Sequence, residues 1–290
     1  MSKMRQIAKK TILDFMEMKQ NGDKMTILTA YDFHIASIEE QIGVDMILVG
    51  DSVGMAVYGY SGGTVPVTMD QMIYHSEAVR RGAPNTFIIG DMPFLSYHES
   101  AADAVRNAGR FYKEAGVDAI KLEGGKRVTP QIRAIVDAGM VVMGHIGLTP
   151  QSTAALGGFK AQGNTAETAM ALLEDAKAVQ EAGAALTLVE AVPAETGKLI
   201  TKTLRIPVIG IGAGADCDGQ AQVYIDVIGL FELFTPKFVK KYADAAGVIR
   251  GALKEWSKEV REGTFPASEH CYKMKEGEAE KLEEMVKKIP

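Results

Sequence analysis

Polar and charged side chains follow short apolar runs repeatedly along this 290-residue chain. They are Asp51 and Ser52 after ILVG, Asp91 after FIIG, Lys121 and Glu123 in IKLEGG, His145 after VVMG, and Glu190 after LTLV. A single Asp at such a position most often caps the next helix. Four carboxylates at corresponding positions need a cation or protons to coexist when buried, because like charges repel and burial disfavours charge.

The residue types indicate which cation would suit them. Oxygen ligands without cysteine, and with one histidine nearby, favour a hard ion such as Mg²⁺ held through carboxylates and water. Lys121 and Glu123 are two residues apart, so a strand would place both side chains on one face. The lysine could then neutralise a substrate carboxylate while the glutamate holds the metal.

The apolar runs themselves predict parallel strands. Each is short and nearly continuous in its hydrophobicity, as expected for strands that are covered on both faces. The eight runs are residues 25–28, 46–49, 86–89, 119–122, 140–143, 186–189, 208–211 and 224–228.

Segments with helical spacing separate these runs, and glycines mark several of their ends. The predicted helices include residues 70–81, 100–114, 129–137, 165–181 and 194–203. Gly116, Gly139 and Gly183 stand where a left-handed residue would close a helix. Eight alternating units predict a (β/α)8 barrel, which places its active site at the carboxyl ends of the strands. An open, doubly wound sheet remains the alternative, because periodicity does not reveal closure.

The glycine-rich segment GIGAGA, residues 210–215, matches a weak form of the dinucleotide fingerprint, with Glu232 about 20 residues further on. Too little chain follows for a dinucleotide domain, and Asp218 with Gly219 interrupts the expected helix start. We therefore expect these glycines to allow close backbone approach at the mouth of the barrel.

Composition excludes several classes of protein. With 47% hydrophobic and 24% charged residues and a net charge of −5, the chain is globular and offers no broad basic field for nucleic acid. Cys217 and Cys271 form no Cys-x-x-Cys pair, which argues against a disulfide framework or structural zinc and fits a reducing cytosol. The basic amino-terminal segment resembles neither a signal peptide nor an anchor, and no apolar stretch predicts a membrane span.

The remaining segments are predicted to be structural. Residues 1–272 should form one barrel domain with an amino-terminal helix, with one or two long helices over 236–262. Residues 273–290 predict a charged tail helix that packs on its own barrel or on a neighbouring subunit. His34, His75 and His98 are expected to be structural, and His270 beside Cys271 has no orienting acid.

Many ordered motifs resemble the ketopantoate (3-methyl-2-oxobutanoate) hydroxymethyltransferase family. They are VGDSVGM (49–55), PVT (66–68), YHSEAVRRGAP (74–84), GDMPF (90–94), KLEGG (121–125), GHIGLTPQS (144–152), GGFKAQG (157–163), VEAVP (189–193), IPVIGIGAG (206–214), DGQ (218–220) and PKF (236–238). The resemblance implies a (β/α)8 barrel of the phosphoenolpyruvate/pyruvate type, cytoplasmic, usually a homodecamer built as a pentamer of dimers. It implies transfer of a hydroxymethyl group from 5,10-methylenetetrahydrofolate to 3-methyl-2-oxobutanoate, giving 2-dehydropantoate for pantothenate and coenzyme A.

The resemblance also implies roles for individual residues. Asp51, Asp91 and Glu123 match the family's metal ligands, and Mg²⁺ is the implied metal. The positions that match its 2-oxo acid contacts are Asp51, Ser52, Asp91 and Lys121. Glu190 matches its proton acceptor, and its place at the end of an apolar strand suits a base strengthened by partial burial. His145 is expected to support the site.

Three departures and two alternatives accompany this interpretation. The segment Tyr60 to Pro66 carries an extra glycine in a loop expected to cover the site. Ile225 and Asp226 stand where the family often has His-Asp, and this chain adds the charged tail.

One alternative is a Mg²⁺-dependent carbon–carbon lyase of the same superfamily, which would turn over without folate. The other is an inactive barrel that serves as an oligomeric scaffold, although a scaffold gives no reason to concentrate charge at the barrel mouth.

Overall fold

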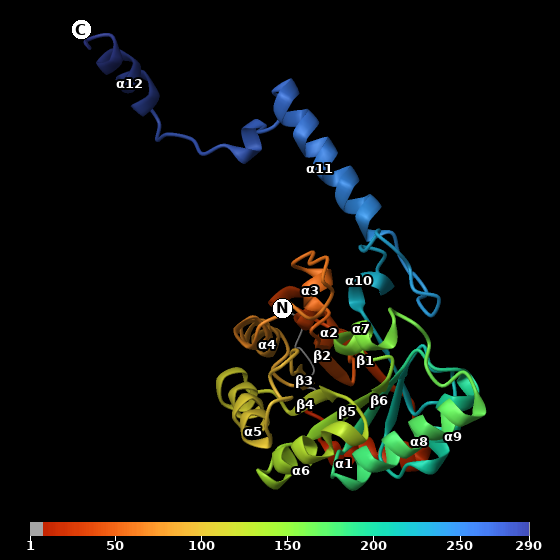
Figure 1. Ribbon diagram of the computed structural model, residues 1–290. Helices are drawn as coiled ribbons and strands as arrows, with labels where there is room; N and C mark the ends of the chain where they lie inside the picture. The colour runs from red at the N-terminus through yellow and green to blue at the C-terminus, as the bar shows by residue number, and fades with distance from the viewer. Residues whose placement is uncertain (1–7, 290) are drawn as a thin grey trace. The chain divides into compact units, whose positions relative to one another are not determined.

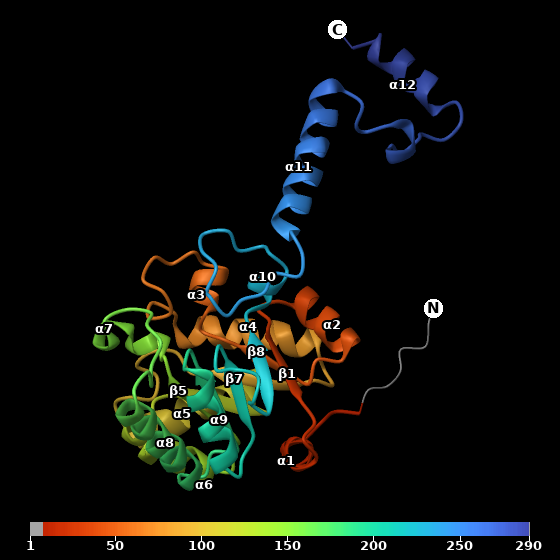
Figure 2. The ribbon, with the colours of Figure 1, turned by 90° about the vertical axis from the view of Figure 1, so that its right-hand side faces the viewer.

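The protein forms a closed barrel of eight parallel strands. Figures 1 and 2 show the strands with helices packed around them. The structure is a computed structural model that describes residues 8–289, so the start of the basic amino-terminal segment lies outside the described residues. The strands are β1 (Met25–Thr29), β2 (Met46–Val49), β3 (Phe87–Asp91), β4 (Ala119–Glu123), β5 (Val142–Gly147), β6 (Leu186–Glu190), β7 (Val208–Ile211) and β8 (Gly219–Gln222). Strand β1 pairs with β8, which closes the sheet and excludes the open, doubly wound alternative.

Helices surround the barrel in the predicted alternation. In the barrel unit they are α1 (Ile12–Asn21), α2 (Phe33–Ile42), α3 (Val53–Ala56), α4 (Met69–Gly82), α5 (Ala101–Arg110), α6 (Thr129–Asp137), α7 (Thr153–Leu156), α8 (Ala166–Glu181), α9 (Ala194–Thr203) and α10 (Tyr224–Val227). A π-helical turn, Phe111–Ala115, extends α5. Gly116, Gly139 and Gly183 all adopt positive φ after their helices, which confirms their predicted role at helix ends.

The eighth strand was predicted in the wrong place. Residues 224–228 were expected to form it because they are apolar, but Tyr224–Val227 is the short helix α10. The strand is Gly219–Gln222, which pairs with both β1 and β7. Its GQAQ sequence carries little hydrophobic signal, so its conformation depends on the two neighbouring strands.

Alternate residues along each strand point into the barrel. The inner side chains include Met46, Phe87, Met143 and Ile209, which pack together in one buried cluster. Strand residues two apart share a face, so the same inward face ends in polar residues at the carboxyl end of the barrel. The alternation that fills the barrel therefore also points Asp91, Glu123, His145 and Glu190 towards its mouth.

Helix α1 closes the amino-terminal end of the barrel. Its Phe15 is fully buried within the inner cluster and meets the ring of Phe87 edge-on, with centroids 5.1 Å apart. Lys19 on the same helix pairs with Asp218 at 2.6 Å. The polar residues named above lie at the opposite, carboxyl end of the barrel.

The chain divides into two compact units, Met1–Ala243 and Asp244–Pro290. The sequence predicted a boundary after residue 272, whereas this division lies after Ala243. The second unit therefore contains the long helix α11 (Ala245–Glu262) as well as α12 (Glu278–Val286). The tail helix is thus present, whereas the helix expected from residue 236 begins at 245. No helix among residues 8–289 is long and apolar enough to cross a membrane.

Candidate active site

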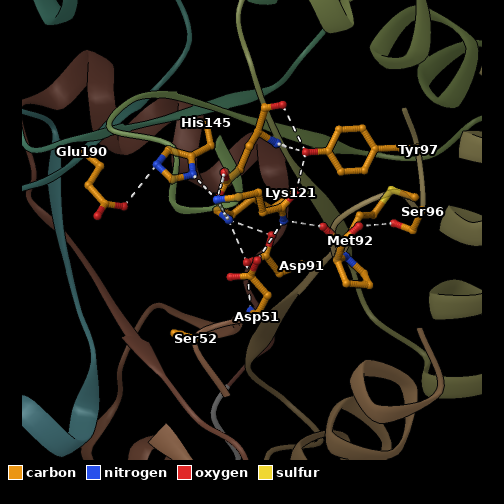
Figure 3. Close-up of polar contacts among 12 residues, drawn as sticks. Asp51, Ser52, Asp91, Met92, Ser96, Tyr97, Lys121, His145 and Glu190 are labelled. Carbon is orange, nitrogen blue, oxygen red and sulfur yellow. Dashed lines mark hydrogen bonds and ion pairs between the residues drawn. The ribbon is translucent and has the colours of Figure 1, made fainter. Parts of the chain in front are cut away.

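The polar residues predicted from the strand ends converge in one buried cluster (Figure 3). Asp91 ends β3, Lys121 and Glu123 lie on β4, His145 on β5, and Glu190 ends β6. Register explains the convergence, because Asp91 is aligned with Lys121 and Glu123 with His145 across adjacent strands. Asp91, Glu123 and His145 are each 1% exposed and Lys121 is 3% exposed, so their charges interact with little screening by water.

Lys121 is the central cation of the cluster. Its Nζ donates to both carboxylate oxygens of Asp91 at 2.7 Å and lies 3.8 Å from Oε1 of Glu123. Burial alone lowers the pKa of Lys121, but Asp91, Glu123 and Asp51 outweigh it and raise that pKa above its usual value. The lysine is therefore a fixed positive charge.

His145 bridges two carboxylates from neighbouring strands. Its Nδ1 lies 3.4 Å from Oε1 of Glu123 and its Nε2 lies 3.2 Å from Oε2 of Glu190. Burial and Lys121 lower the pKa of His145, but Glu123 and Glu190 more than compensate and raise it to about 9. Burial would raise the pKa of Glu123, yet His145 and Lys121 hold it below its usual value.

Asp51 joins the cluster from the loop after β2. Its backbone N–H donates to Oδ2 of Asp91 at 3.1 Å, and its own Oδ2 accepts from Gln151 at 2.8 Å. Burial, followed by the charges of Asp91 and Glu123, raises the pKa of Asp51 well above its usual value. A cation beside this carboxyl would therefore stabilise its charged form.

Ser52 lies beside Asp51 but is held by a different partner. Its hydroxyl is 2.7 Å from the hydroxyl of Tyr31, a fully buried side chain after β1. Burial raises the pKa of Tyr31, so the phenol remains a neutral hydrogen-bonding group. Ser52 thus has a fixed orientation next to the acidic cluster.

The donor set suits a hard cation, but Lys121 occupies the middle of it. Among residues 8–289 no three acidic, histidine or cysteine side chains are already arranged as metal ligands. Oε1 of Glu123 is nevertheless buried and accepts no hydrogen bond from a described residue. Three buried carboxylates with an unused oxygen are the chemistry that Mg²⁺ prefers, so the residues fit this ion.

Other predicted features behave as structural elements. Gly212 has φ of +67°, and a Cβ there would lie 2.6 Å from the ring of Phe238. The glycine-rich segment leads to strand β8 and to no helix, which excludes the dinucleotide fingerprint and confirms its use in close approach. Cys217 and Cys271 are both free.

Sequence reasoning did not identify Gln151 and Tyr97 as part of the site. Gln151 follows β5 within the motif GHIGLTPQS, and Tyr97 lies in the loop after β3. Both are buried, and the Tyr97 hydroxyl donates to Oε1 of Gln151 at 2.8 Å. Their position in loops after strands was the available signal, but a neutral polar residue there does not stand out from sequence.

Comparison with known proteins gives the same family as the motifs. The family model for ketopantoate hydroxymethyltransferase matches residues 9–268. The 3-methyl-2-oxobutanoate hydroxymethyltransferase of Alkaliphilus metalliredigens (strain QYMF) is 60% identical over 264 residues, 91% of this chain and 93% of that protein. The enzyme of the same name from Clostridium novyi (strain NT) is 53% identical, over 94% of this chain and 99% of its own.

Solved structures show the same barrel in more distant proteins. A phosphonopyruvate hydrolase matches with a TM-score of 0.59 at 15% identity, covering 97% of both chains. A 2,3-dimethylmalate lyase of the PEP mutase/isocitrate lyase superfamily matches with a TM-score of 0.57 at 16% identity, covering 95% of this chain and 98% of its own. These likenesses confirm the predicted (β/α)8 barrel fold. The family match and the identities above show that this chain belongs to the ketopantoate hydroxymethyltransferase family and is a hydroxymethyltransferase of pantothenate biosynthesis.

Proposed function

We propose that the buried cluster at the barrel mouth transfers the one-carbon unit of 5,10-methylenetetrahydrofolate to 3-methyl-2-oxobutanoate. The overall reaction consumes one water and releases tetrahydrofolate and 2-dehydropantoate. The observation that carries the proposal is the convergence of six charged side chains in one cluster: Asp51, Asp91, Lys121, Glu123, His145 and Glu190. The family membership supports the choice of substrates.

We further propose Mg²⁺ as the cofactor, with Asp51, Asp91 and Glu123 as its ligands. When bound, the ion would polarise the keto group of the 2-oxo acid and so acidify the hydrogen on C3. The free Oε1 of Glu123 and the high proton affinity of Asp51 support this assignment. Both observations describe carboxylates whose charged form a nearby cation would stabilise.

Glu190 is the proposed base. Its side chain is 15% exposed, so it can reach a substrate while remaining next to His145. The carboxylate would remove the proton from C3, and the resulting carbon nucleophile would bond to the one-carbon unit. Both bonds from that carbon to folate nitrogens break, tetrahydrofolate leaves, and water supplies the hydroxyl oxygen of the product. The positive charge of His145, 3.2 Å from Oε2 of Glu190, holds the carboxylate in place.

Lys121 and Ser52 are proposed to bind the 2-oxo acid together with Asp51 and Asp91. The ammonium of Lys121 already contacts two carboxylates, so a substrate carboxylate would share it or displace Asp91 from one of its hydrogen bonds. The Ser52 hydroxyl, oriented by Tyr31, can donate to a substrate oxygen. These contacts would fix the orientation of the keto acid before proton removal.

We also propose that the chain assembles into a homodecamer, a pentamer of dimers, in the cytoplasm. Helix α11 supports self-association, because Ile249, Leu253, Trp256 and Val260 lie at helical spacing and are 45%, 61%, 55% and 45% exposed. A continuous apolar stripe of this kind suits the surface of a second copy. The two free cysteines fit a reducing compartment.

One assay tests the proposed reaction. Purified protein is incubated with 3-methyl-2-oxobutanoate and 5,10-methylenetetrahydrofolate, with Mg²⁺ or with a chelator, and 2-dehydropantoate is measured. We expect product that depends on both folate and metal. Absence of product in both conditions would overturn the proposal, and cleavage of a substrate without folate would favour the lyase instead.

A further inference from the structure

Gln151 connects two of the proposed metal ligands, Asp51 from the loop after β2 and Glu123 from β4. It lies in the 3-10 turn Pro150–Ser152 after β5 and is 4% exposed. Its side-chain Nε2 donates to Oδ2 of Asp51 at 2.8 Å, and its backbone N–H donates to Oε2 of Glu123 at 2.9 Å. One residue therefore occupies one oxygen of each carboxylate.

The other oxygen of Glu123 remains available. Oε1 is buried, accepts no hydrogen bond from a described residue, and has only the longer ion-pair contacts to Lys121 at 3.8 Å and His145 at 3.4 Å. A carboxylate with one oxygen already bonded to an N–H group favours coordination through the other oxygen. The contact from Gln151 thus favours binding of the metal through a single oxygen of Glu123.

The amide of Gln151 has one preferred orientation. Its Oε1 accepts from the Tyr97 hydroxyl at 2.8 Å, and its Nε2 also donates to the backbone carbonyl of Met92 at 2.9 Å. A flipped amide would place its oxygen against Asp51 and Met92 oxygens, which cannot donate. Tyr97 in turn accepts from the backbone N–H of Glu123 at 3.1 Å. The two residues form a connected, buried network around both ligands.

We propose that Gln151, oriented by Tyr97, is a positioning residue that sets the spacing and the free oxygens of Asp51 and Glu123 for the divalent cation. This role rests on the proposed metal site, because Gln151 and Tyr97 would position two of the carboxylates that hold the metal. Gln151 touches neither substrate nor metal in this assignment. Its effect on the reaction passes through the two carboxylates.

The test measures Mn²⁺ binding in place of Mg²⁺, because Mn²⁺ can be followed by electron paramagnetic resonance. The variant Gln151→Met keeps the approximate volume but removes the amide, and Gln41→Met in the exposed part of α2 is the matched control. For Gln151→Met we expect affinity to fall by about 10- to 100-fold, the range found when an outer partner of a ligand is removed. The spectrum of the saturated variant should also change shape, which a loss of stability alone would not produce. Gln41→Met should bind as the parent does.

The remaining outcomes separate this inference from the metal site itself. If the parent binds Mn²⁺ and Glu123→Gln loses it, while Gln151→Met matches the parent in affinity and spectrum, the positioning role is wrong and the metal site stands. If the parent binds no Mn²⁺, both fail. Should Gln151→Met not fold, Tyr97→Phe removes only the hydroxyl that orients the amide; a weaker, altered Mn²⁺ signal supports the inference, and an unchanged one overturns it.

Discussion

Nε2 of His145 lies 3.2 Å from Oε2 of Glu190, while the opposite nitrogen of the same ring lies 3.4 Å from Glu123. The imidazole therefore links the proposed base to a proposed metal ligand. With a pKa of about 9, His145 carries a positive charge near neutral pH. That charge offsets part of the surplus of buried carboxylates and holds Glu190 at the rim of the cluster.

Replacing Glu190 by Gln should abolish proton removal while preserving substrate binding. The amide keeps the shape of the side chain but cannot accept the C3 proton. We expect exchange of the C3 hydrogen of 3-methyl-2-oxobutanoate with deuterated water to slow by about 100-fold or more, as followed by NMR. Calorimetric affinity for the keto acid should change little. Glu195→Gln, exposed in the first turn of α9, is the control, and unaltered exchange in Glu190→Gln would exclude it as the base.

Replacing Asp91 by Asn should weaken both metal binding and the fold. The substitution removes the charged partner that Lys121 contacts at 2.7 Å and leaves Glu123 at 3.8 Å as its ion-pair partner; breaking a buried pair in this way typically costs about 3–5 kcal/mol. Urea unfolding without metal measures this loss of stability, and a Mg²⁺ titration measures the expected fall in affinity. Asp103→Asn breaks the exposed pair with Arg106 and should cost less than about 1 kcal/mol. Equal losses in the two variants, or a normal Mg²⁺ titration of Asp91→Asn, would contradict the assignment.

Replacing Glu39 by Gln should change how stability depends on pH. Glu39 on α2 is 3% exposed, and neither carboxylate oxygen has a hydrogen-bond partner among the described residues. Burial, and to a lesser extent Asp32, raise its pKa from 4.5 to about 8, and Tyr224 is the other titratable group it influences. The native state then holds a proton that the unfolded chain releases, so the free energy of unfolding falls as pH rises from about 4.5 to 8.

The Glu39→Gln variant has no titratable carboxyl at this position, so its unfolding releases no such proton. Its stability relative to the parent should increase across that window, by on the order of 2–5 kcal/mol in total. Urea unfolding at a series of pH values measures the difference. Glu17→Gln on the exposed side of α1 is the control and should run parallel to the parent. A Glu39→Gln curve that is also parallel to the parent would mean that Glu39 is ionised in the folded protein.

Charged substitutions on the apolar stripe of α11 should disrupt self-association. Leu253→Glu combined with Trp256→Glu places two charges on a surface that must lose water on assembly. Light scattering after gel filtration should report a smaller species than the parent. Lys254→Glu, which lies off the stripe, is the control for an added negative charge. An unchanged mass for the double variant would remove this stripe from the proposed interface.

Much of the site could be predicted from sequence because one physical rule places it. Strands of a parallel barrel all end at the same mouth, so Asp91, Glu123 and Glu190 could be assigned together before their distances were known. The first seven strands were located for the same reason, since burial on both faces requires continuous apolar runs. The motifs then indicated the family, which the comparisons confirm.

Tertiary structure decided what depends on partners far away in the chain. Gly219–Gln222 is a strand because β1 and β7 supply its hydrogen bonds, whereas the more apolar Tyr224–Val227 is free to form a helix. The fixed pairing of Lys121 with Asp91 and the contacts of Gln151 arise only when strands and loops meet. Sequence supplies the chemical groups and their periodicity, but distance and burial, which set charge and hydrogen bonding, exist only in the folded chain.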